Sequence, residues 1–307
     1  MPVYFREVRV REMLPRKGVS IASKRILHRE EEFFNSVKPL TNLMRFWGVF
    51  SLNTHLRYAV FSFSWMWCLL VTMTLIVVQV FEKTQKLREL KRPLYMSRTI
   101  LVGLTTLIYD KDMPDLIISI GKFDETYFKT FNVKEKYGRL SRGSTWIYIN
   151  IFTCGVILAD FFENEEILYG RFFSYVGRQM STYLYLFFCI HLIIRFRNLR
   201  KKWNYQIQRI TAKTFINVEV WEEHLEHTRL LYHSLCILVT KLSVCYGYKL
   251  AVNIITMFLT ILLDLYEYLY VLRNFHMNHT IGTFFEFVTI ILICIISGKV
   301  TWEVNIH

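Results

Sequence analysis

The chain has 307 residues, of which 53% are hydrophobic and 16% aromatic, and its formal net charge at pH 7 is +13. Soluble domains rarely combine these values, because apolar surface must be buried somewhere. The composition therefore argues against an ordinary soluble domain. It favours a membrane protein with basic cytosolic loops over a nucleic-acid-binding protein.

Residues 1–57 are expected to form a basic leader that stays in the mature chain, since the first apolar run starts only near Tyr58. Within the leader, the segment FFNSVKPLTNLMRFWGVF (33–50) has an apolar stripe at helical spacing, formed by Leu40, Leu43, Met44, Trp47 and Phe50. A basic amphipathic helix beside a membrane span is expected to lie at the cytosolic interface.

Apolar segments after Tyr58 predict an all-α polytopic membrane bundle over residues 58–298, since a membrane helix needs about 20 mostly apolar residues. The six predicted spans are 58–81, 94–109, 145–162, 172–194, 250–271 and 281–297.

Lys and Arg are concentrated in residues 1–57, 110–144 and 195–249, so these parts are expected in the cytosol. The N-terminus and the tail, 299–307, are then cytosolic too, in a chain that resides in the plasma membrane. Residues 82–93 are the exception, because they place five basic residues on the predicted outside.

The loop at 195–249 is predicted to be helical. One apolar stripe continues the fourth span and consists of Phe196, Leu199, Trp203, Ile207 and Ile210, and a returning helix begins around Trp221. Two amphipathic helices must bury their apolar stripes against each other, the membrane surface or neighbouring subunits. The sequence leaves these three alternatives open.

Charged residues within the spans suggest a ligand site. Five of them fall in the outer third of their predicted spans: Arg98, Asp160, Arg178, Asp264 and Glu286. Charges inside a membrane are costly and often mark ligand or ion pathways. With Tyr185 as an aromatic wall, they predict a pocket for a small molecule that opens to the outside. The alternative is that these charges extend to the interface or pair between helices.

Other kinds of site find little support. The pairs His224/His227 and His276/His279 have HxxH spacing but fall on opposite sides of the predicted membrane, so no metal or other cofactor is expected. No nucleophile or phosphate-binding motif is present, which argues against an enzyme. Asn278 begins an N-glycosylation sequon on the predicted outside.

Two segments resemble the insect gustatory receptor family. The first is FFNSVKPLTNLMRFWGVF, with its Pro-Leu, a basic residue and Gly-x-Phe; the second is LCILVTKLSVCYGYKLAVNIITMFLTILLDLYEYLY (235–270), with Tyr246-Gly247 and a Phe-rich span closing on Leu-Tyr. The resemblance runs from about Phe33 to the end.

This resemblance implies seven spans, a cytosolic N-terminus and a homo- or hetero-tetrameric, ligand-gated cation channel that detects small external tastants. It also implies that cytosolic extensions of the later spans build the subunit contacts. The family's Thr-Tyr, five apolar residues and Gln-Phe are absent, so the sequence as given is expected to be a fragment lacking the seventh span.

The sequence therefore predicts a gustatory receptor that contacts membrane lipid and binds no nucleic acid. The alternative is a G-protein-coupled receptor or a membrane carrier with six helices. A G-protein-coupled receptor normally has its N-terminus outside, which the charge distribution opposes. A carrier would be favoured by an internal repeat, and none is evident.

Overall fold

The computed structural model describes residues 113–131, 169–211, 218–270 and 277–305, and the single positions 37, 70, 73, 74, 97, 100, 101, 104 and 105. Within these residues every regular element is a helix. The helices are α4 (Met113–Phe131), α6 (Tyr169–Thr211), α7 (Val218–Tyr270) and α8 (Met277–Asn305). The described part of the chain is therefore all-α, and the leader 1–57 lies almost entirely outside it.

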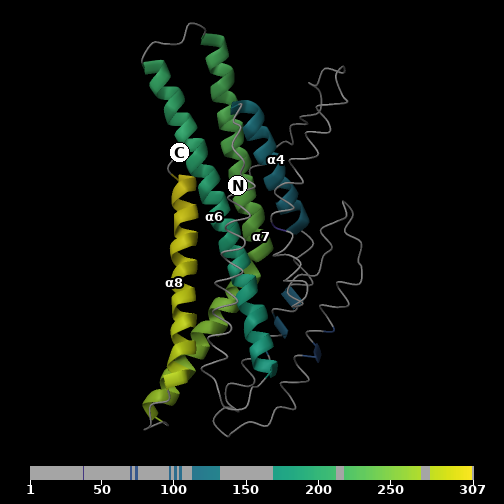
Figure 1. Cartoon of the computed structure of the whole chain (residues 1–307), viewed down its shortest axis with the longest axis vertical. Coiled ribbons are helices and arrows are strands. Elements are labelled where there is room, and N and C mark those ends of the chain that lie inside the picture. Colours follow the sequence, from purple (N-terminus) through teal and green to yellow (C-terminus); the bar gives the residue numbers. More distant parts are fainter. Residues whose placement is uncertain are drawn as a thin grey trace, which may run out of the picture.

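Helices α6 and α7 form a long antiparallel pair, with α8 on one side and α4 on the other (Figure 1). Helix α7 contacts the other three helices, and α8 also packs against α6. The start of α7 and the end of α6 extend past the C-terminal end of α8 (Figure 1).

The lengths of α6 and α7 exceed the thickness of a membrane. The 43 residues of α6 and the 53 residues of α7 span about 65 Å and about 80 Å at 1.5 Å per residue. A hydrocarbon core is about 30 Å thick. Each helix unites a predicted span with part of the predicted loop 195–249, without a break.

Helix α4 lies in a stretch, 110–144, for which the sequence analysis expects only a loop. Its buried apolar residues recur every three or four positions and are Met113, Leu116, Ile117, Ile120, Phe123 and Tyr127. Asp115 in the first turn and Lys129 in the last suit the helix dipole. A search for apolar runs of membrane length does not detect an amphipathic helix of this kind.

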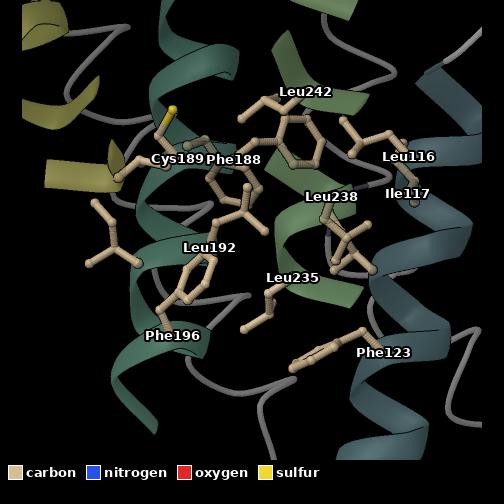
Figure 2. Close-up of a cluster of buried hydrophobic side chains, with 14 of the residues drawn as sticks. Leu116, Ile117, Phe123, Phe188, Cys189, Leu192, Phe196, Leu235, Leu238 and Leu242 are labelled. Carbon is tan, nitrogen blue, oxygen red and sulfur yellow. The ribbon is translucent and has the colours of Figure 1, made fainter. Parts of the chain in front are cut away.

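The core lies where α4, α6 and α7 meet (Figure 2). Helix α4 contributes Leu116, Ile117 and Phe123 on one side; α6 contributes Phe188, Cys189, Leu192 and Phe196 on the other; Leu235, Leu238 and Leu242 of α7 lie between them. The burial of α4 therefore depends on the same apolar residues that join α6 to α7.

Two segments, Glu222–Leu263 and Glu286–Asn305, have the length and apolar composition needed to cross a membrane. The later part of α7 and the middle of α8 also expose many large apolar side chains: Tyr248, Ile255, Phe258, Leu259, Leu262, Leu265, Tyr266, Leu269, Phe284, Phe287, Ile291, Leu292 and Ile295. Contiguous apolar surface of this extent is rare on soluble monomers. These observations support a membrane location. The predicted spans 58–81, 94–109 and 145–162 lie mostly outside the described residues.

Candidate functional site

The structure reaches two of the six predicted ligand-site side chains. Arg98 and Asp160 lie outside the described residues. Arg178 is in α6 and Asp264 in α7, but their side chains are outside the described set. Tyr185 and Glu286 remain. The sequon residue Asn278 lies in the first turn of α8, and its side chain is likewise not described.

Tyr185 joins α6 to both of its neighbours. Its hydroxyl lies 2.9 Å from the Ser297 hydroxyl of α8. Its ring is tilted against the Tyr246 ring of α7, with centroids 5.8 Å apart. The hydrogen bond and the ring contact fix the Tyr185 side chain at the junction of α6, α7 and α8.

Glu286 is buried on α8 at a different level from Tyr185. It is 4% exposed and is followed one turn later by Thr289, which is buried and hydrogen-bonds to the Tyr183 hydroxyl of α6. The partner of Tyr185, Ser297, is about 16 Å further along α8 than Glu286 at 1.5 Å per residue. Between Thr289 and Ser297 the buried face of α8 is apolar.

The α6–α7 interface is polar at the depth of Thr182. The Asn253 amide donates a hydrogen bond to the Thr182 hydroxyl at 3.5 Å, and both residues are about 1% exposed. On the next turns of α7, Thr256 and Thr260 are buried and donate to carbonyls of their own helix. Uncharged hydroxyl and amide groups therefore lie between α6 and α7, next to an apolar cluster that includes Met257, and they could bind the polar groups of a small molecule.

A buried ion pair holds α4 to α6. Arg195 donates through Nε to Asp124 Oδ1 at 2.8 Å and through a terminal nitrogen to Oδ2 at 2.5 Å. A third donor reaches the His191 carbonyl at 3.0 Å. Arg195 is 1% exposed and Asp124 is 7% exposed. Burial raises the pKa of the Asp124 carboxyl, and the adjacent guanidinium opposes that rise.

A second ionic contact joins α6 to the end of α8. The Glu303 carboxylate, 2% exposed, accepts from Arg197 at 2.9 Å and lies 3.3 Å from a terminal nitrogen of Arg200. The Arg200 guanidinium also lies over the Trp302 ring, 5.7 Å from its centroid. In addition, the Tyr232 hydroxyl of α7 donates to the Val304 carbonyl. These contacts explain why α8 continues as a helix to Asn305, beyond its predicted end at 297.

Two half-exposed groups connect α4 to α7. Lys241 donates to Asp115 at 2.5 Å and to the Ser119 hydroxyl at 2.9 Å. Together with the buried pairs, this contact links all four helices by charge. The sequence analysis assigned no role to Asp124, Asp115 or Glu303, because their partners are far away along the chain. For Asp124 and Glu303 the shared signal is a carboxylate on an otherwise apolar helical face, whereas Asp115 is exposed.

The described residues contain no group of three or more His, Cys, Asp and Glu side chains that could hold a metal ion. Single polar contacts join α6 to α7 and α6 to α8, next to a region where ion pairs connect the helices. No family model, curated protein or solved structure matches the chain.

Proposed function

We propose that this chain is a chemosensory receptor of the gustatory type, a subunit of a ligand-gated cation channel that detects small external molecules. The observation that carries the proposal is the build of α6 and α7. Each is far longer than a membrane span, and each combines an apolar part with a part that carries ion pairs. This agrees with the resemblance of segments 33–50 and 235–270 to gustatory receptors.

In this proposal the chain crosses the plasma membrane six times with its N-terminus in the cytosol. The apolar parts of α6, α7 and α8 cross the bilayer, and the ion-paired parts extend into the cytosol. A tastant enters between the outer parts of these helices and uses the Glu286 carboxyl there, together with the Thr289 hydroxyl one turn deeper. Its binding favours one of two helix arrangements, and the ligand shifts the equilibrium by its difference in affinity.

Topology and conduction test the proposal together. An epitope placed before Met1 should be labelled only after the cells are permeabilised, because the leader is cytosolic. Cells expressing the chain with other receptor subunits should show tastant-evoked cation currents that cells lacking the chain do not. Labelling of intact cells would instead favour a G-protein-coupled receptor, and evoked calcium release without a plasma-membrane current would point the same way.

Glu286→Gln should raise the tastant concentration for half-maximal current by about tenfold, as expected for the loss of one charge-assisted hydrogen bond. Glu286 is buried on α8, one turn before Thr289, which hydrogen-bonds to Tyr183. The measurement is a current dose–response curve at matched surface expression.

Glu226→Gln provides the matched control. Glu226 is an exposed glutamate near the start of α7, far from Glu286, and it pairs with the nearby Arg229. Its dose–response curve should coincide with that of the unmodified chain. If both variants shift the curve equally, Glu286 has no specific place in ligand recognition.

A further inference from the structure

Where α6 and α8 meet beyond their apolar parts, one face carries Arg197, Arg200, Lys201 and Lys299, together with Trp302; these five residues are the basic cluster. Residues three and four apart share a helix face, so Arg200 and Lys201 are neighbours of Arg197, and Lys299 is a neighbour of Glu303. The ion pairs from Arg197 and Arg200 to Glu303 bring the two helix faces together.

The charges of the basic cluster are only partly balanced. One carboxylate, Glu303, faces four cations, which leaves three positive charges. Lys201 and Lys299 are exposed and have no ion-pair partner among the described residues. Glu303 occupies one nitrogen of each arginine, whereas a guanidinium has five N–H donors. The side chains of Arg197 and Arg200 are 43% and 30% exposed, so the remaining donors can reach a ligand.

The position of the basic cluster matches the depth of lipid headgroups in the proposed topology. The predicted spans end at residues 194 and 297, so every member of the cluster lies within about 10 Å of a span end at 1.5 Å per residue. Headgroups occupy roughly the outermost 5–8 Å on each side of a bilayer. Because α6 and α8 both run out of the membrane here, their Cα–Cβ bonds tilt back towards it.

The exposed side chain of Trp302 is a second indication that the basic cluster lies at the level of the lipid headgroups. Its ring is 55% exposed although it stacks with Arg200. Exposed tryptophan beside basic residues is typical of the membrane–water interface on the cytosolic side. The acidic residues of the first turns of α7, such as Glu222 and Glu226, lie about 36–42 Å beyond the predicted start of its span, so they do not repel an anionic leaflet.

We propose that the basic cluster binds a phosphomonoester on the headgroup of a membrane lipid, of the phosphoinositide class. A phosphomonoester carries a charge of about −1.5 to −2 and three acceptor oxygens, which suits two arginine forks and two flanking lysines. Trp302 lies beside this phosphate in the headgroup layer. This binding rests on the proposed membrane placement and not on any response to tastant.

The test uses the full chain purified in dodecyl maltoside and a fluorescent phosphatidylinositol 4,5-bisphosphate, with binding followed by anisotropy. Lys201→Gln combined with Lys299→Gln should raise the Kd about 25-fold, since each basic residue near an anionic lipid contributes about fivefold. Both lysines are exposed, so gel filtration should show an unchanged profile.

The matched control, Lys122→Gln combined with Arg229→Gln, removes two exposed positive charges elsewhere on α4 and α7. Its Kd should change by less than about twofold. Equal weakening in both double variants would overturn the proposal, because only net charge would then matter. Equal competition by phosphatidylserine would overturn the selection of a phosphomonoester, and equal competition by soluble inositol trisphosphate would overturn the assignment to a lipid. None of these outcomes depends on a channel current, so the proposed function is tested separately.

Discussion

Replacing Asp124 by alanine is expected to destabilise the chain by about 3–5 kcal/mol, the usual loss when one member of a buried ion pair is removed. The Arg195 guanidinium makes two hydrogen bonds to this carboxylate and is 1% exposed, so its charge would remain buried without a counterion. Scanning fluorimetry of the purified chain in detergent should show a Tm lower by about 10 °C.

Two further variants separate a buried charge from charge in general. Glu226→Ala removes the partner of Arg229 in a fully exposed pair and should leave the Tm unchanged. The double change Asp124→Leu with Arg195→Met removes both charges and should recover most of the lost stability. If the double variant is less stable than Asp124→Ala alone, the ion pair stabilises the fold by more than the neutralisation of its two charges.

Phe188→Ala is expected to lower the free energy of unfolding by about 3–5 kcal/mol, the usual effect of a large-to-small substitution in a well-packed core. The Phe188 ring is 0% exposed and lies among side chains of α6 and α7 at the centre of the bundle (Figure 2). The cavity would weaken the surface on which α4 packs. Limited proteolysis should therefore cut within α4 at a higher rate, alongside a lower Tm.

Phe258→Ala serves as the control for this change. It removes the same type of side chain from α7, at a position that is 55% exposed. Its Tm should stay close to that of the unmodified chain. If Phe258→Ala lowers the Tm as much as Phe188→Ala does, the exposed face of α7 is covered by other residues in the folded chain. That result would contradict its assignment to lipid.

Periodicity in the sequence predicts the long helices well. The stripe from Phe196 through Ile207 predicts a helix beyond the fourth apolar segment, and the structure has α6 as far as Thr211. The ends of the helices are harder to predict from the sequence. Helix α8 passes through Gly298, because the later residues Val300 and Glu303 are buried against neighbouring helices. Such tertiary support is invisible in a local apolar window.

The sequence predicts which types of residue form the polar contacts, but it does not predict which residues pair with one another. Arg195 is visible as one basic residue among several, but its partner lies 71 positions earlier, in a stretch without a membrane-length apolar run. Nothing local distinguishes Arg195, which is 1% exposed, from its exposed neighbour Lys201. Only the packing of α4 against α7, which brings it within reach of α6, makes that distinction.

The uninterrupted course of α7 has a mechanical consequence. A rigid rod converts a small rotation near one end into a large displacement at the other. For 53 residues, a tilt of about 5° moves the far end by up to about 7 Å, given a rise of 1.5 Å per residue. A displacement of that size exceeds one helical turn, so a modest rearrangement at one end would be amplified at the opposite end of the same helix.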